Sequence, residues 1–383
     1  MTVGIIKGPR GENMPTTPTH LLSPISSYES ATRVISAGAD EVYCAVRIPG
    51  IKHLMLNRPP VCAVRAYDEL KKIVDYAHDH NVKVNVTTEL PFMAEIVEEK
   101  ICNHVLSCVE QDIDALIVGD IGILLAVKNM DPNIPLYAST FMASMNYEAV
   151  DFLRKLGVER IILERAVTTS EIQEIVRRSR GVEIEIFVHG AGCSNIEGNC
   201  YLLHSLTATP YRAMKQEYYK ASLCLIPFKI HEINGDNVRT PDEVFDIPKE
   251  VLHQFANQVP ILDAYSQCSL CRLPELIRAG VTGFKIVGRC LTPSYQERTT
   301  RWYRELIDLI EQDSMEAFQE RLEAIKREPI YHLMLGRERK NVVIPVTLMK
   351  SSCQQKRCFY SPLFFAPYKQ PPWSPNRDAE TED

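Results

Sequence analysis

Short apolar runs alternate along the chain with longer segments whose apolar residues recur at helical spacing. The segments 67–78 and 170–178, for example, place their apolar residues on one face of a helix. The strand-like runs are short and mostly continuous, which favours parallel strands that are covered on both faces. Eight such runs are found, at 21–25, 41–46, 83–88, 115–119, 136–140, 160–164, 183–188 and 284–288.

Eight successive strand–helix units predict an α/β fold, a TIM-like (β/α)8 barrel. No Gly-x-Gly-x-x-Gly turn follows the first strand, so nothing favours an open dinucleotide-binding sheet instead. In such a barrel the carboxyl ends of the strands meet on one face, where barrels of this type place their chemistry.

Two long segments do not fit the simple repeat. Residues 190–282 form a cysteine-bearing insertion before the last strand, and an insertion of that length is usually functional. After the last strand, the pattern over 299–326 predicts one long helix that closes the barrel. We expect a barrel domain over residues 1–327 with the insertion included, and a partly disordered C-terminal extension over 328–383.

Composition narrows the class of protein. The chain has 383 residues, 45% of them hydrophobic, and a formal charge of −6. This charge provides no basic stripe for phosphates, so a nucleic-acid partner is not required, although a local patch is not excluded. No apolar stretch is long enough to span a membrane, and the N-terminus has no charged-then-apolar leader. We expect a cytoplasmic protein.

The insertion holds the most informative residues, which are cysteines. Cys193 and Cys200 lie just past the seventh strand, and Cys224 and Cys268 follow at loop positions. Cytoplasmic thiols stay reduced and thiolates are soft ligands, so these four cysteines predict a metal site. Four thiolates suit a 4Fe-4S cluster or a tetrahedral zinc equally well, and unliganded thiols are the remaining alternative.

Several motifs together resemble the peptidase U32 family, which includes collagenase-like proteases and oxygen-independent hydroxylation proteins of ubiquinone and RNA. The resemblance covers roughly 21–310. The most specific motif is Glu185-x-Phe187-x-His189-Gly-Ala191-x-Cys193-x-x-x-x-Gly198-x-Cys200. The others are Gly38-Ala-Asp-Glu-Val-Tyr43, Ala138-Ser-Thr140 with Asn146, 156–160, Leu273-Pro-Glu-Leu276, Ala279-Gly-Val281 and Phe284-Lys-Ile-x-Gly-Arg289.

The resemblance implies a 4Fe-4S cluster held by Cys193, Cys200, Cys224 and Cys268, with Cys268 matching the fourth position better than Cys271. The chain also departs from the family pattern. Phe228 stands where some members have another cysteine, and Ala166 and Val287 replace carboxylates at strand ends. Proton transfer by those two carboxylates is therefore absent or relocated, which puts the family's standard substrate in doubt.

Polar residues at the predicted strand ends define a candidate mouth of the barrel. We expect His189, Arg165 and Lys285 in catalytic roles there, with substrate-binding residues Asn85, Glu89, Asp120, Thr140 and Arg289. The cations suit a small anionic ligand. Alternatively, Lys285 and Arg289 pair with Glu164 or Asp120 only to hold the rim, and His189 is a core histidine.

Three functions compete. The first is a hydroxylation-type iron–sulfur enzyme, for which the resemblance implies prephenate or a related oxygen donor and no use of O2. The second is a peptidase, but no Gly-x-Ser-x-Gly or His-Glu-x-x-His motif supports it. The third is a non-catalytic, cluster-binding partner of a homologous subunit. We expect the first, acting on a small anionic or aromatic molecule.

Overall fold

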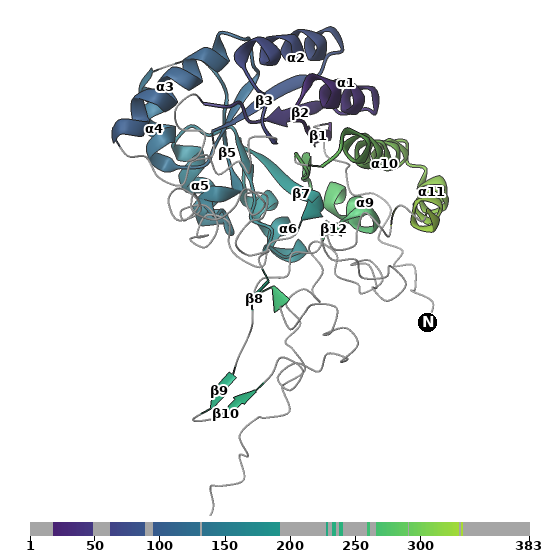
Figure 1. The fold of residues 1–383 in the computed structure, drawn as a ribbon. Coiled ribbons are helices and arrows are strands. Elements are labelled where there is room, and N and C mark those ends of the chain that lie inside the picture. Colours follow the sequence, from purple (N-terminus) through teal and green to yellow (C-terminus); the bar gives the residue numbers. More distant parts are fainter. Residues whose placement is uncertain are drawn as a thin grey trace, which may run out of the picture.

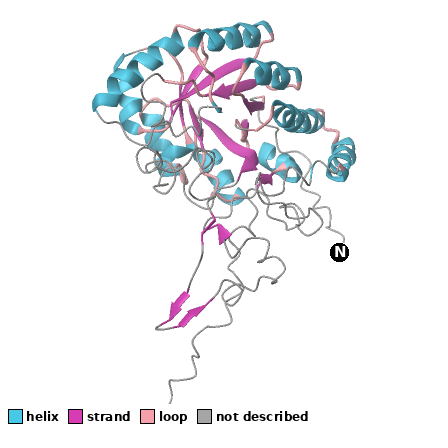
Figure 2. Ribbon diagram, in the orientation of Figure 1, coloured by secondary structure: helices cyan, strands magenta, loops and turns pink. Residues whose placement is uncertain are grey.

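The computed structural model describes residues 18–48, 62–88, 95–130, 132–191, 227–228, 232–234, 237–239, 259–260, 266–289, 291–328 and 331. Within them, eight parallel strands close into a barrel with helices outside, which confirms the (β/α)8 prediction (Figures 1 and 2). The barrel strands are β1 (His20–Pro24), β2 (Glu41–Cys44), β3 (Lys83–Thr88), β4 (Ala115–Val118), β5 (Leu136–Ala138), β6 (Arg160–Ile162), β7 (Glu183–Ala191) and β13 (Gly283–Ile286).

Closure of the barrel depends on β13, which pairs with two strands that lie far from it in the sequence. β13 pairs with β1, with Phe284 opposite Leu21, and with β7, with Phe284 opposite Ile186. All pairings among the eight strands are parallel. The carboxyl ends of the strands therefore lie at one end of the barrel.

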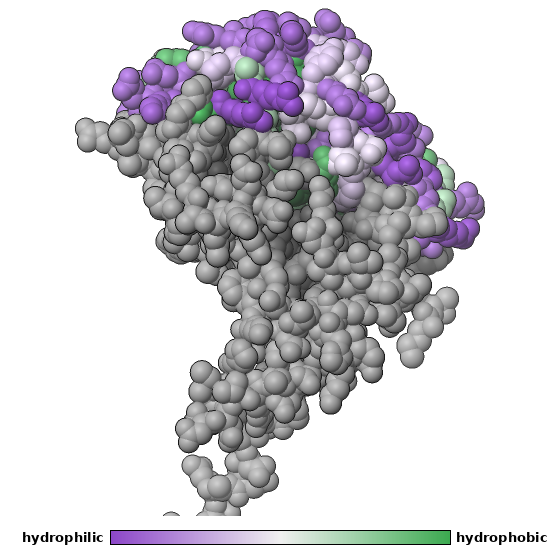
Figure 3. Space-filling view, in the orientation of Figure 1, coloured by the Kyte–Doolittle hydropathy of each residue, from purple (hydrophilic) through white to green (hydrophobic). Residues whose placement is uncertain are grey.

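The helices pack their apolar faces on the outside of the strands. They are α1 (Tyr28–Ser36), α2 (Tyr67–Asp79), α3 (Glu95–Val109), α4 (Ile121–Met130), α5 (Tyr147–Lys155), α6 (Thr169–Arg178), α9 (Leu273–Arg278), α10 (Pro293–Glu311) and α11 (Met315–Arg327), with short 3₁₀ turns η2 (Thr140–Met142) and η7 (Leu270–Arg272). Capping side chains fix several starts: Thr168 and Glu171 form a capping box at α6. On the face shown in Figure 3, the described helices expose mainly hydrophilic side chains.

The predicted helix over 299–326 is wrong in one respect, because two helices occupy this stretch. α10 ends at Glu311 and α11 begins at Met315. Between them Asp313 adopts a left-handed conformation with φ 52°. A single residue in this conformation ends a helix and redirects the chain.

The insertion is also more structured at its ends than the sequence pattern predicts. β7 continues to Ala191, and β12 (Ser266–Cys268) pairs with it antiparallel. β13 pairs with one edge of β7. β6 pairs with the other edge only as far as Glu185, and β12 pairs with that edge beyond Glu185. Further along, β8 (Pro227–Phe228) pairs with β11 (Val259–Pro260), and β9 (Glu232–Asn234) with β10 (Asn237–Arg239).

No helix in the described part of the chain combines the length and apolarity that crossing a bilayer requires. The division into a barrel domain and a C-terminal extension stays a prediction, because residues 332–383 lie outside the described part.

Candidate functional site

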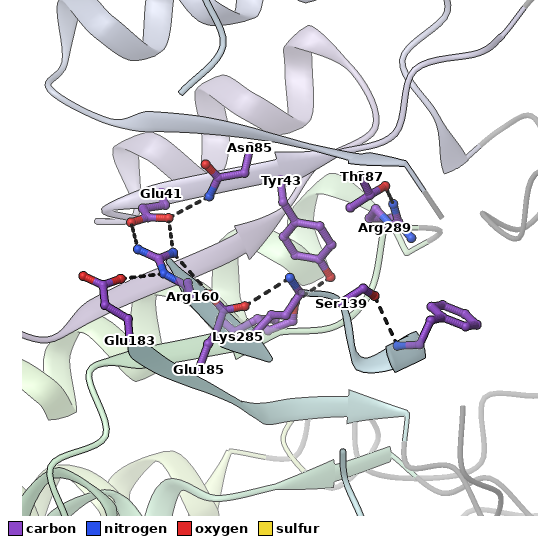
Figure 4. Close-up of polar contacts among 12 residues, drawn as sticks. Glu41, Tyr43, Asn85, Thr87, Ser139, Arg160, Glu183, Glu185, Lys285 and Arg289 are labelled. Atoms are coloured by element: carbon purple, nitrogen blue, oxygen red, sulfur yellow. Dashed lines mark hydrogen bonds and ion pairs between the residues drawn. The ribbon is translucent and has the colours of Figure 1, made fainter. Parts of the chain in front are cut away.

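A buried ion pair forms the floor of the barrel interior. Both terminal nitrogens of Arg160 bind the carboxylate of Glu41, with N–O distances of 2.7 and 2.9 Å (Figure 4). Burial by itself would raise the pKa of Glu41, but the hydrogen bonds and charge of Arg160 outweigh it and hold the pKa at about 2. Glu183 binds the same guanidinium at 2.7 Å from the more exposed end. The floor is therefore charged, hydrogen-bonded and compensated.

Asn85 belongs to this floor and not to the mouth. Its side-chain amide donates to Glu41 at 2.7 Å, and the residue is fully buried. Asn85 is the third residue of β3, so it lies one layer below the strand end. The expectation that Asn85 lines the rim is thus wrong by one layer of inward-facing side chains.

Lys285 lies one layer above, where Figure 4 shows it pointing toward Glu185. Its ammonium group is 3.1 Å from the Glu185 carboxylate and 4.1 Å from the centre of the Tyr43 ring. The second Glu185 oxygen is 3.3 Å from Arg160, so one carboxylate joins the two layers. The carboxylate of Glu185 on the neighbouring strand is therefore a partner of Lys285 that was not among those expected, Glu164 or Asp120.

Arg289 reaches the mouth from the loop after β13. It donates to the Thr87 hydroxyl at 2.8 Å, and its guanidinium carbon is 5.3 Å from the Tyr43 ring centre. The Tyr43 hydroxyl in turn donates to the carbonyl of Ile286 at 2.9 Å. Tyr43 therefore lies beside two cations and fixes the strand that carries one of them.

A second guanidinium near the strand ends lies on another aromatic ring. Arg165 stacks on Phe187 with its guanidinium carbon 4.2 Å from the ring centre. Next to it, Glu164 accepts from the Thr140 hydroxyl at 3.1 Å and from the Arg165 amide at 3.0 Å. The Glu164 carboxylate thus joins the Thr140 side chain to the Arg165 backbone, while the Arg165 guanidinium lies on Phe187.

Asp120 has a structural role in the described part of the chain. Its carboxylate accepts from the backbone amide of Ile123 at 3.0 Å, in the first turn of α4. Such a bond satisfies a helix N-terminus and needs no ligand. Glu89, the other predicted carboxylate, lies outside the described residues.

His189 turns away from the barrel interior, contrary to expectation. The register between β13 and β7 shifts, so that Lys285 is opposite Phe187 and Ile286 opposite His189. The extra residue reverses the facing of the side chain. His189 lies against α10, with Nε2 3.2 Å from the Tyr295 hydroxyl, and burial lowers its pKa to about 3. It is a buried neutral imidazole.

Of the four predicted ligands, the described residues include only Cys268. It lies in β12 directly opposite His189, is 2% exposed, and its Sγ is 3.2 Å from the Tyr331 hydroxyl. Cys193, Cys200 and Cys224 lie outside the described residues. Among the described side chains, no three His, Cys, Asp or Glu groups are arranged to hold a metal. Cys271 is exposed on η7.

Two other cysteines bear on the expectation of reduced thiols. Cys44, at the end of β2, is fully buried, and burial raises the pKa of its thiol to about 12, so it is inert. Cys62 is disulfide-bonded, which departs from that expectation.

The expected site residues did not include the charged residues of the floor or the aromatic residues that contact the site side chains. Charged residues inside strand runs were the available signal, because a charge is rarely buried without a partner. This signal marks Glu41, Arg160 and Glu185. Tyr43 and Tyr331 carry no comparable signal, since aromatic residues are ordinary in strands and cores.

Comparison with known proteins gives a consistent picture. The family model described as peptidase family U32 matches residues 26–342. The chain is 29% identical to the Escherichia coli 23S rRNA 5-hydroxycytidine C2501 synthase, over 76% of this chain and 39% of that protein. It is 27% identical to the E. coli tRNA hydroxylation protein P, over 75% and 67%, and 29% identical to the uncharacterized protease MJ0090 of Methanocaldococcus jannaschii, over 80% and 69%.

The chain thus spans well under half of the first of these relatives. Among solved structures, the U32 peptidase Mk0906 aligns with 16% identity and a TM-score of 0.40, over 56% of this chain and 90% of that one.

Proposed function

Because the chain belongs to peptidase family U32, we propose that it is a 4Fe-4S-dependent, hydroxylation-type enzyme that acts without O2 on a small anionic or aromatic substrate. The proposal combines the reaction named for several relatives with the side chains at the mouth of the barrel.

The mouth supports a flat, electron-rich ligand. Two guanidinium groups, of Arg165 and Arg289, lie on aromatic rings 4.2 and 5.3 Å away, which holds their planes in place. Guanidinium groups bind carboxylates with paired hydrogen bonds and stack on planar rings. This arrangement is the single observation that carries the substrate class.

The described residues that would lie beside the cluster are compatible with it. Cys268 is buried, and its strand pairs with the segment that leads into Cys193, four residues beyond His189. A four-residue chain reaches at most about 14 Å, so both cysteines can belong to one centre. Cys193, Cys200, Cys224 and Cys268 would hold the cluster, with zinc as the alternative. When bound, it would supply electrons or a Lewis-acidic iron.

The chain's own residues would then divide the remaining work. Arg165 and Arg289 orient the anionic or aromatic substrate, and Thr87 and Thr140 present hydroxyls beside them. Lys285 lies beneath the substrate, where Glu185 holds its position and offsets its charge. His189 plays no part at the mouth, because it faces α10.

A pyrimidine base of RNA is the second candidate substrate, favoured by the names of the relatives. An unpaired base is a planar ring that stacks well on guanidinium groups. The net charge of −6 does not favour a long RNA contact, so we place the free small molecule first. A non-catalytic, cluster-binding role beside a homologous partner subunit is the remaining alternative.

The decisive experiment begins with protein purified without air. We expect about four irons and four sulfides per chain, as a cluster of this type requires. Cys193→Ser and Cys268→Ser should lose most of the iron, whereas Cys271→Ser should keep it. Full iron in Cys268→Ser would disprove the proposed ligand set, and zinc in place of iron would select the alternative.

Substrate class is tested in strains with and without the chain. Loss of a hydroxylated small aromatic acid, with RNA nucleosides unchanged, would support the first candidate. Loss of a hydroxylated pyrimidine nucleoside would support the second. Arg289→Gln should reproduce the loss, while Arg177→Gln, on the exposed face of α6, should not. No change in either pool would contradict the proposed function.

A further inference from the structure

Tyr331 is a buried residue beyond the barrel that reaches back to one of the proposed ligands. It is fully buried after α11, and its ring meets Trp302 of α10 edge-on, 5.7 Å between centres. Its hydroxyl is 3.2 Å from Cys268 Sγ. The contact joins positions 63 residues apart, so tertiary packing alone produces it.

The nature of this contact depends on the charge of the sulfur. A buried hydroxyl loses stability unless it is hydrogen-bonded. A neutral thiol is a weak acceptor, whereas a thiolate that binds a metal is negatively charged and accepts strongly. A metal-bound Cys268 has no proton to donate, so Tyr331 is then the donor in this pair.

Tyr303 has a different role in the same region. Its hydroxyl donates to the carbonyl of Val188 and accepts from the amide of Ser269 at 3.1 Å. Val188 lies on β7, in the segment that leads to Cys193, and Ser269 follows Cys268 directly. Tyr303 therefore hydrogen-bonds to both segments that lead to proposed ligands. Tyr331, in contrast, contacts the Cys268 sulfur itself.

From this geometry we infer that Tyr331 is a positioning residue that donates a hydrogen bond to the cluster-bound sulfur of Cys268 and raises the reduction potential of the cluster. The inference rests on the cluster of the proposed function. A hydrogen bond to a ligand sulfur withdraws charge from the centre, so it stabilises the reduced, more negative state. Reduction would become easier than with the sulfur in an apolar environment.

The test is a redox titration of Tyr331→Phe, which keeps the ring and its packing on Trp302 but removes the hydroxyl. We expect iron and sulfide contents equal to those of the unchanged protein and a midpoint potential shifted to more negative values. Tyr28→Phe is the matched control, because Tyr28 is 41% exposed at the start of α1, and its potential should not change.

A full cluster with an unchanged potential in Tyr331→Phe would overturn the inference. If this variant does not fold or load iron, a 3-fluorotyrosine placed at 331 gives an independent measurement. Its more acidic hydroxyl is a stronger donor, so the potential should move to more positive values, and no movement would again overturn the inference.

The outcome is separable from that of the proposed function. A cluster whose potential responds as expected, in a protein that hydroxylates nothing, would support the role of Tyr331 and contradict only the activity. If the protein without substitutions binds no iron when prepared without air, both the role of Tyr331 and the proposed function are overturned.

Discussion

Glu185 is the residue on which the charges of the barrel interior depend. It is fully buried and contacts both Lys285 and Arg160, which belong to two different layers. Removing one partner of a buried ion pair leaves an uncompensated charge, which is far more costly than losing a pair at the surface.

We therefore expect Glu185→Gln to lower the free energy of unfolding by about 3–5 kcal/mol. Glu174→Gln is the matched control, because Glu174 pairs with Arg177 at the solvent-exposed surface of α6, so the loss of this carboxylate should cost far less. Urea denaturation of both variants measures the difference. Equal losses would show that the interior charges do not depend on Glu185.

A buried histidine outside the barrel predicts how stability depends on pH. His104, on α3, is 1% exposed and bonds the Tyr67 hydroxyl through Nδ1 at 2.9 Å. Burial lowers its pKa from 6.5 to about 4. Between these values the unfolded chain takes up a proton that the folded chain excludes, so stability falls as the pH falls.

This histidine should remove about 3 kcal/mol of stability between pH 6.5 and 4, with the contribution complete above pH 6.5. In His104→Gln the slope of stability against pH should be smaller in that window. The same slope in this variant and in the protein without substitutions would contradict the assignment.

At the scale of elements, the break between α10 and α11 depends on one backbone conformation. Asp313 has φ 52° and an exposed side chain, so little packing is at stake there. A β-branched residue is strained in this conformation, whereas glycine adopts it without strain.

Asp313→Val should therefore lower the free energy of unfolding by about 1–2 kcal/mol, and Asp313→Gly should raise it by about 0.5 kcal/mol. Thermal unfolding of the two variants provides the comparison. If both substitutions changed the free energy of unfolding in the same direction, the left-handed conformation of Asp313 would not determine the end of α10.

Apolar spacing predicts the elements of the barrel well. All eight barrel strands follow from it, as do the helices expected over 67–78 and 170–178, which the structure places at 67–79 and 169–178, because burial of one face requires that spacing. Apolar spacing did not predict the break between α10 and α11 at Asp313, since polar residues at a helix end resemble those of an exposed helical face. The bulge in β7 escaped it too, because the register is a property of two strands.

At the scale of the molecule, the barrel places its charges in layers. The floor and middle hold Glu41, Arg160, Glu185 and Lys285, all nearly excluded from water. Above them, Arg165 and Arg289 reach the mouth on aromatic supports. The interior is thus used for compensation and the strand ends for binding, which is how barrels of this architecture separate stability from function.

The sequence by itself determined the barrel and the family motifs, because local spacing and residue type are sufficient for each of these. The roles of the cysteines and of Thr140, Arg165 and Arg289 stay predictions. Only the tertiary structure decided that Lys285 pairs with Glu185, that Asn85 belongs to the floor, and that His189 faces α10. The physical reason is that partner and facing depend on register between strands and on packing across the barrel, which no single segment encodes.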